Sequence, residues 1–217
     1  MADKSKSMAA NSAPQRETHG SDKARRARPR KRRAQIIDAA AQVFAELGYS
    51  AASTQNIAGV LGLRQASLYY YFRSKDDALS EVCLIGVQGF LEELEAICDS
   101  TSGFAEKVRA GILNHMMPLR EKRAYVLVFL RDRHRMSGPG RKEVGKVTRA
   151  YEKLWRDLIE EGQRAGAFDP APDARTVTLA ISGMCNAASA WLDPETDGEI
   201  ERVAGQFADL VLHGLAR

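Results

Sequence analysis

The sequence of 217 residues contains little cysteine and no long apolar run. Its three cysteines, Cys83, Cys98 and Cys185, form no CxxC pair, and their odd number does not fit a closed disulfide framework. We therefore expect reduced core thiols in a cytoplasmic protein. The longest stretch without a charged residue, 176–192, has 17 residues and includes polar ones. It is too short and too polar to span a membrane, so we expect no membrane contact of that kind.

The sequence also lacks the motifs of catalysis and metal binding. His19, His115, His134 and His213 are scattered, with no HExxH spacing and no cluster with cysteine. No GxSxG, Walker or GxGxxG motif is present. We predict no catalytic residue, no metal site and no cofactor. His115 and His134 could each donate a hydrogen bond in a ligand pocket, although an exposed or internally satisfied histidine is the commoner case.

Positive charge is concentrated in the N-terminal third of the chain. Residues 1–75 contain 14 Lys and Arg against 5 Asp and Glu, whereas residues 76–217 contain 18 against 23. The basic part is the expected partner of a polyanion. Its densest stretch, 23–33, is either a solvated charge run or an arm that contacts DNA phosphates or the minor groove. We predict a disordered basic tail over residues 1–29.

Apolar residues recur at helical spacing through the rest of the chain, and no alternating strand pattern is visible. The sequence therefore predicts an all-α fold of about nine helices. Glycine, proline and serine runs set their limits. The predicted helices are 31–47, two short ones within 54–75, 75–99, 104–119, 121–136, 140–165, 173–191 and 197–215.

The stretch 54–75 predicts two short helices joined by a glycine turn. Thr54 is a favourable N-cap, and Gly62 lies where a helix end tolerates positive φ. Two helices this short need a third to pack on, and the helix at 31–47 can supply that apolar surface. The inward apolar positions are Ile57, Ala58, Leu61, Leu63, Leu68 and Phe72. Polar residues on the other face of the second helix favour a helix-turn-helix that docks in the major groove.

The second short helix carries side chains suited to base edges. Arg64 can make a bidentate contact with guanine and Gln65 with adenine, while Ala66 or Tyr70 can touch a thymine methyl. Three consecutive tyrosines span most of a helical turn, so they cannot all be buried. The side chains expected to hold phosphates are Thr54, Tyr69, Tyr71 and Lys75.

This stretch resembles the DNA-binding motif of the TetR (tetracycline repressor) family over about residues 32–80. The matching positions are Phe44, Gly48, Thr54, Ile57, Ala58, Gly62, Leu68, Tyr69, Phe72 and Lys75. The resemblance implies contacts with the DNA backbone from Thr54, Gln55, Tyr70, Tyr71 and Lys75. It implies base contacts from positions 64–70, which include Arg64, Gln65, Ala66, Ser67, Tyr69 and Tyr70. Tyr71 stands where many relatives have histidine.

The resemblance also implies two domains, a DNA-binding domain at 30–78 and an effector-binding and dimerisation domain at 79–217. The helix at 75–99 belongs to both and would link them mechanically. Relatives bind a small effector in the second domain, and the effector expected here is a fatty acid or an acyl-coenzyme A. The residues that we expect to line the pocket, unless they merely fill a core, are Phe90, Met116, Met117, Tyr125, Phe129, Arg133, Trp155 and Met184.

Three arginines beside this apolar set, Arg131, Arg133 and Arg135, could hold a carboxylate or a coenzyme A phosphate, unless they are solvated. The helices near 173–191 and 197–215 look apolar on more than one face, which requires a second packing partner. In the family these helices pair across a two-fold axis, so we predict a homodimer on a palindromic operator of double-stranded DNA.

Two rival functions follow from the same residues. The first is a ligand-responsive transcriptional regulator, expected to be a repressor that its effector releases from the operator. The alternative is a small-molecule-binding helical scaffold that attaches to nucleic acid or membrane nonspecifically through its basic tail. Only the regulator would discriminate strongly between duplex sequences. A helical enzyme is disfavoured by the missing motifs.

Overall fold

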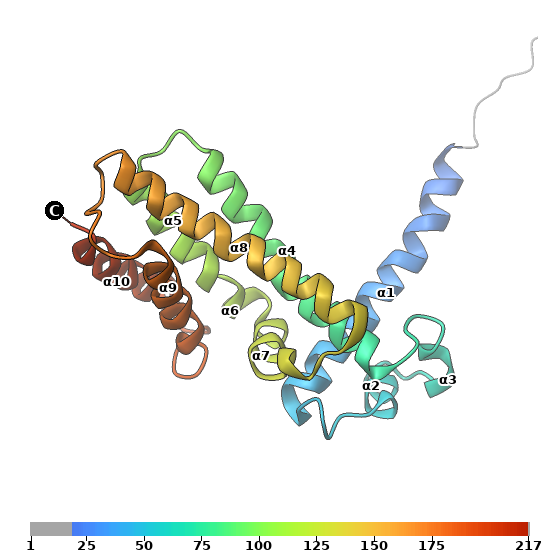
Figure 1. Cartoon of the computed structure of the whole chain (residues 1–217). Coiled ribbons are helices and arrows are strands. Elements are labelled where there is room, and N and C mark those ends of the chain that lie inside the picture. The colour runs from blue at the N-terminus through green and yellow to red at the C-terminus, as the bar shows by residue number, and fades with distance from the viewer. Residues whose placement is uncertain (1–18, 217) are drawn as a thin grey trace, which may run out of the picture. The chain divides into compact units, whose positions relative to one another are not determined.

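The computed structural model describes the backbone of residues 19–216 and the side chains of residues 30–216. The chain divides into two units between Gln35 and Ile36. All regular elements among the described residues are helices, which confirms the predicted all-α class (Figure 1). No helix in this part of the chain combines the length and apolar character needed to cross a membrane.

The first helix, α1, spans His19–Leu47 and so begins twelve residues before the predicted start at 31. The predicted tail at 1–29 therefore includes helical residues from His19 onward, while residues 1–18 lie outside the described part. Within the larger unit, Ile36, Ala40 and Phe44 are fully buried on one side of α1. The helix ends at Leu47, because Gly48 adopts a φ of +77° that glycine accepts without strain.

The next two helices are α2, Thr54–Val60, and α3, Gln65–Leu68. The predicted cap at Thr54 is wrong, because Ser53 caps α2. Its hydroxyl accepts from the backbone N–H of Asn56 at 3.1 Å, and the Asn56 side chain accepts from the Ser53 N–H at 2.9 Å. This capping box satisfies two donors that the helix leaves unpaired.

The turn after α2 contains a glycine at positive φ, as the sequence predicts. Gly62 has a φ of +61° and donates its N–H to Gly59, while the N–H of Leu63 donates to Ala58 at 2.9 Å. This pair of bonds is a Schellman motif, which closes the end of α2 and directs the chain into α3. Helix α3 is shorter than predicted, since the chain turns after Leu68.

Helix α4 spans Lys75–Asp99, as predicted. It starts at the Ser74 cap, whose hydroxyl accepts from the N–H of Asp77 at 3.1 Å. Its first half belongs to the same buried core as α1, α2 and α3, through residues such as Leu79 and Val82. Its second half belongs to a second core, which includes Leu94. The helix therefore joins two cores, which gives a physical basis to the predicted mechanical link.

The remaining helices differ from the prediction mainly where a predicted helix is divided. The segment 104–119 is divided at Met117 because Pro118 starts a new helix, where proline needs no N–H partner. The segment 121–136 ends as a 3-10 turn, η1. The bounds are α5 Phe104–Met116, α6 Pro118–Glu121, α7 Arg123–Asp132, η1 Arg133–Arg135, α8 Gly138–Arg164, α9 Ala174–Ala188 and α10 Glu199–Gly214.

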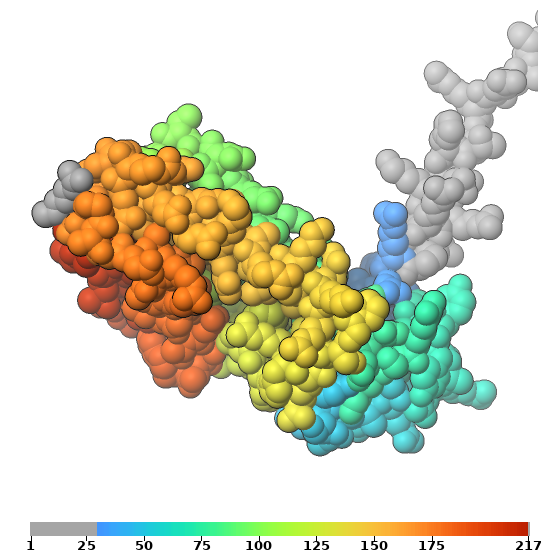
Figure 2. All heavy atoms as spheres, viewed as in Figure 1, coloured from blue at the N-terminus to red at the C-terminus, as the bar shows by residue number. Residues whose placement is uncertain are grey.

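The second core is centred on Trp155 of α8, which is fully buried. Gly111 of α5 makes this packing possible, because a Cβ at that position would lie 2.6 Å from the Trp155 ring. Within residues 36–217, α9 and α10 lie at the end away from α2 and α3 (Figures 1 and 2).

Candidate DNA-binding surface and ligand pocket

One face of α3 is open to solvent, as the sequence predicts. Leu68 and Phe72 are buried in the core beneath it. Tyr70 is 87% exposed and makes an edge-to-face contact with Tyr71, with ring centroids 5.3 Å apart. Tyr71 is half-buried against the core, so the three tyrosines are not all buried. The other exposed side chains of this surface are Gln55, Arg64, Gln65, Ala66, Ser67 and Tyr69.

Gln65 is held by a side chain of the preceding helix. Its Nε2 donates to Oγ1 of Thr54 at 2.6 Å. The sequence predicts a base contact for Gln65 and a phosphate contact for Thr54, but it does not predict this bond between them. The bond fixes the Gln65 amide at the start of α3, where a recognition helix meets base edges.

Lys75 lies beneath the loop that joins α1 to α2. Its Nζ donates to the carbonyl oxygens of Tyr49 and Ala52, each at 2.8 Å, and lies 4.4 Å from the centre of the Tyr49 ring. Two of its three donors are therefore engaged within the chain. The Tyr49 hydroxyl in turn donates to Asp76, and burial together with that bond raises the pKa of Tyr49. Lys75 thus holds the loop against α4.

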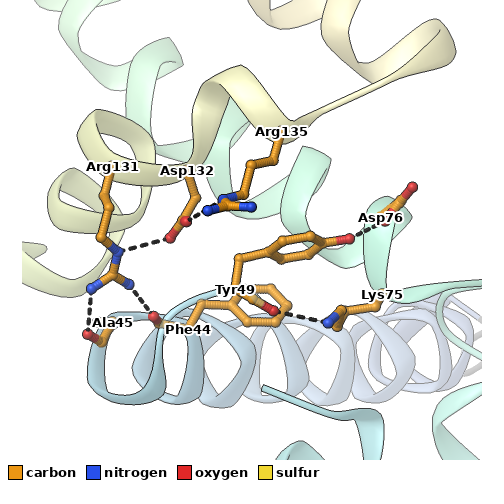
Figure 3. Close-up of polar contacts among 8 residues, drawn as sticks. All are labelled: Phe44, Ala45, Tyr49, Lys75, Asp76, Arg131, Asp132 and Arg135. Carbon is orange, nitrogen blue, oxygen red and sulfur yellow. Dashed lines mark hydrogen bonds and ion pairs between the residues drawn. The ribbon is translucent and has the colours of Figure 1, made fainter. Parts of the chain in front are cut away.

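Arg131 connects α7 to the end of α1 (Figure 3). Its Nη1 donates to the carbonyl of Ala45 at 3.1 Å, and its Nη2 donates to the carbonyl of Phe44. A cation at this position stabilises the C-terminal end of α1, where the helix dipole is negative. Asp132, only 3% exposed, accepts from Arg131 Nε at 3.0 Å and pairs with Arg135 at 3.4 Å.

These contacts correct the interpretation of the three arginines. Arg131 and Arg135 form an ion-pair network with Asp132. Of the three arginines, only Arg133 lines the pocket between α4, α7 and α8 that is described next. Tyr125 was also expected in the pocket, but its hydroxyl donates to Asp38 of α1 at 2.5 Å. Burial and this bond raise the pKa of Tyr125. Helix α7 is therefore tied to α1 at two places.

A pocket lies between α4, α5, α7, α8 and α9. Its cavity holds about 80 Å³, and the space counted out to the solvent at its mouth is about 680 Å³. Apolar side chains dominate its wall, with a few polar groups between them. Its lining is Gly86, Val87, Phe90, His115, Leu119, Val126, Phe129, Leu130, Arg133, Thr148, Tyr151, Glu152, Ser182, Cys185 and Asn186.

His115 forms the centre of a polar group in this pocket. Its Nδ1 lies 2.8 Å from the Tyr151 hydroxyl, and its Nε2 lies 3.1 Å from Oδ1 of Asn186. Burial lowers the pKa of His115, which favours the neutral imidazole. Since Oδ1 can only accept, Nε2 carries the proton, and Nδ1 accepts from the Tyr151 hydroxyl.

Apart from Tyr125, the predicted pocket residues divide into three sets. Phe90, Phe129 and Arg133 line the pocket. Met116 and Trp155 are fully buried in the second core and do not line it. The other two lie on different grooves. Met117 lines one beside α4 that contains Glu92, Glu93 and Glu121, and Met184 lines one between α9 and α10.

Sequence reasoning missed Tyr151 and Asn186. The sequence offered only a weak indication of this role for Asn186. It is a polar residue in the uncharged stretch 176–192, and a polar residue in such a helix often has a hydrogen-bond partner on a neighbouring helix. The three cysteines are free, and burial raises the pKa of Cys83 and of Cys185 to about 12. No group of His, Cys, Asp or Glu suited to a metal ion occurs among the described residues.

Two family profiles match the chain. The profile of bacterial regulatory proteins of the tetR family matches residues 36–82, which cover α2, α3 and their supporting helices. The profile of the tetracyclin repressor-like C-terminal domain matches residues 101–215, more than half of the chain. The chain belongs to the TetR family. It is therefore a DNA-binding transcriptional regulator, and the family is regulatory rather than enzymatic.

Several relatives are similar over most of their length. The HTH-type transcriptional repressor KstR2 of Mycobacterium tuberculosis is 27% identical over 191 residues, covering 86% of this chain and 94% of that protein. The structure of PfmR from Thermus thermophilus is 28% identical, with a TM-score of 0.77, covering 84% of this chain and 99% of that one. Bacillus subtilis FadR, solved with stearoyl-CoA, has a TM-score of 0.70 at 22% identity, covering 84% and 98%.

Proposed function

We propose that this TetR-family regulator is a homodimeric repressor that leaves a palindromic operator when an apolar effector with an anionic group occupies the pocket. The observation that carries the proposal is α7. One side of this helix lines the pocket through Phe129 and Leu130, and the next residue, Arg131, contacts the end of α1. Occupancy of the pocket can therefore bias the position of the DNA-binding helices.

The proposed DNA contacts come from α2 and α3. Arg64 and Gln65 would contact base edges, with the Thr54 bond holding the Gln65 amide in place. Tyr70, the most exposed of the tyrosines, would contact a phosphate or a thymine methyl. Lys75 keeps one donor for a phosphate, although its main contacts are internal. The backbone contacts expected of Gln55, Tyr69 and Tyr71 remain predictions.

The proposed dimer interface is the face formed by α9 and α10. Leu179 on α9, Trp191 just after α9 and Leu210 on α10 are large exposed apolar residues, and Leu210 is 65% exposed. An apolar groove between the helices, with Met184 and Leu210 in its wall, lies on the same face. A second copy of the chain would cover these side chains, and two-fold symmetry would match two half-sites about one DNA turn, ~34 Å, apart.

The effector proposal rests on Arg133. Its guanidinium lies 4.9 Å from the centre of the Phe129 ring and forms no ion pair among the described residues. A cation that lines an apolar pocket and forms no ion pair suits a ligand with a carboxylate or phosphate, such as a fatty acid or an acyl-coenzyme A. The stearoyl-CoA held by FadR supports this class by analogy. A regulator of transcription acts where the DNA is, so we expect a cytoplasmic protein.

The test is selection of bound duplexes from a random pool by the full-length protein, followed by release with fatty acids and acyl-coenzyme A thioesters. We expect enrichment of one palindrome, binding by a dimer in light scattering, and release by members of one ligand class. Recovery of unrelated sequences at equal affinity would contradict the proposal. If one operator is enriched but no ligand of this class releases the protein from it, only the proposed effector class would be contradicted.

A further inference from the structure

The polar side chains of the pocket leave hydrogen-bond donors unused. In the group around His115, Asn186 accepts with Oδ1, so both protons of its Nδ2 remain available. No hydrogen-bond partner for Nδ2 exists among the described residues. Ser182 lies one turn earlier on α9, lines the same pocket, and likewise bonds to no described residue. These two donors occupy a wall that is otherwise mainly apolar.

Asn186 and Ser182 are both partly exposed, so water can reach these donors in the empty pocket, and an acceptor oxygen of a ligand would replace that water. The bonds within the His115 group run from the Tyr151 hydroxyl to Nδ1 of His115 and from Nε2 of His115 to Oδ1 of Asn186, so they use neither proton of the Asn186 amide nitrogen. Burial keeps this imidazole neutral, so the group offers no charge to an anion. The donors of Asn186 and Ser182 therefore suit a neutral acceptor oxygen.

The charged group of the pocket lies elsewhere. Arg133 lies against α7, with its guanidinium 4.9 Å from the centre of the Phe129 ring. His115 packs instead against Phe90 of α4, with ring centroids 5.3 Å apart. The pocket thus has a cationic group beside Phe129 and a neutral hydrogen-bonding group beside Phe90.

We propose that the effector carries a ketone or another neutral acceptor oxygen on its apolar body, which Asn186 and Ser182 bind, at a distance from the anionic group that Arg133 binds. This inference rests on the proposed effector pocket and makes it more specific. A plain fatty acyl chain of the same length would leave both donors unpaired. The subsite therefore selects an oxygenated ligand over an unmodified chain.

The experiment compares matched ligands on the full-length protein. The probes are decanoic acid, its analogue with a ketone on the penultimate carbon, and the coenzyme A thioesters of both. Calorimetry measures each dissociation constant, and the same ligands are tested for release of operator DNA. We expect the ketone to bind about fivefold to tenfold more tightly than the plain chain, with the acid or with the thioester.

Asn186→Leu tests the residue, and Asn114→Leu is the matched control. Asn114 lies next to His115 in sequence but lines the groove beside α4 rather than the pocket. We expect Asn186→Leu to abolish the preference for the ketone and the control to keep it. If Asn186→Leu does not fold, Ser182→Ala replaces it and should reduce the preference.

Equal affinity of the wild-type protein for ketone and plain chain would overturn the inference while leaving the effector pocket in place. A preference that survives both Asn186→Leu and Ser182→Ala would also overturn it, because the oxygen would then be bound elsewhere. Absence of binding and of DNA release by all four probes would count against the effector proposal itself, and against this inference with it.

Discussion

The DNA-binding surface and the pocket differ in how their functional side chains are held. On the surface, Gln65 bonds Thr54 and Lys75 bonds two carbonyl oxygens of the loop before α2. In the pocket, the amide protons of Asn186 have no hydrogen-bond acceptor among the described residues, and the guanidinium of Arg133 has no ion-pair partner there. The surface is organised before DNA arrives, which lowers the entropy cost of binding. The pocket, in contrast, is completed only by a ligand.

Arg131 joins these two regions, and its loss should have the largest effect. We expect Arg131→Gln to bind operator DNA but to respond weakly to effector, because the contact with the α1 carbonyls is lost. In the wild type we expect the effector to change DNA affinity by a factor of about 5 to 150, and in Arg131→Gln this factor should fall toward one. Fluorescence anisotropy of labelled operator, with and without effector, measures this.

The control for that variant is Arg135→Gln. Arg135 pairs with the same Asp132, but no hydrogen bond or ion pair among the described residues joins it to α1. It should keep most of the effector response. Equal loss in both variants would show that the ion pairs with Asp132, rather than the capping of α1, carry the coupling.

Gln65→Ala should relax base preference at one operator position, at a cost of ~1–3 kcal/mol, because an amide that contacts a base edge would be lost. Gln55→Ala, which changes the same side chain on α2, should weaken all sequences alike if Gln55 contacts the backbone. Affinities for operator variants with each base in turn measure both. Uniform weakening by Gln65→Ala would exclude its role in specificity.

Lys75→Met should lower the free energy of unfolding by about 1–2 kcal/mol, since two hydrogen bonds from a charged donor are lost. If the third donor also reaches a phosphate, the slope of log affinity against log salt should fall by ~0.9. Urea unfolding and a salt titration measure the two effects. Arg73→Ala is the control, since this side chain is exposed and forms no hydrogen bond or ion pair with a described residue of the loop. Unchanged stability of Lys75→Met would contradict the structural role.

The smallest expected effect concerns His115. Its pKa is lowered in the folded protein by burial, so the unfolded chain takes up a proton first as the pH falls. The stabilisation is complete above about pH 6.5, the ordinary pKa of histidine, and is lost as the pH falls below it. Urea unfolding across this range should show a weaker loss in His115→Gln than in the wild type. Parallel curves would contradict a neutral, buried imidazole.

Much of the DNA-binding region could be predicted from sequence because its signals are local. Gly62 is a turn that requires positive φ, and the apolar spacing of Ile57 and Leu68 defines the buried side. The cap was misassigned because Ser53 and Thr54 are both good caps, and only Asn56, three residues after Ser53, completes a capping box.

The pocket was predicted less well because its wall depends on how helices face one another. Apolar periodicity cannot distinguish Trp155, which fills the core, from Phe129, which lines the cavity. Likewise, Arg131 and Arg133 are two residues apart, and only the tertiary arrangement sends one to α1 and the other to the pocket. Residue type alone carries no such information.

The most direct test of the account is the ratio of two dissociation constants at one salt concentration, for the selected palindrome and for a scrambled duplex of the same length and composition. An exposed face of α3 that contacts bases predicts a ratio of ~10³ or more. A ratio near one would contradict base recognition by α3 and leave only the attraction of basic residues for phosphate.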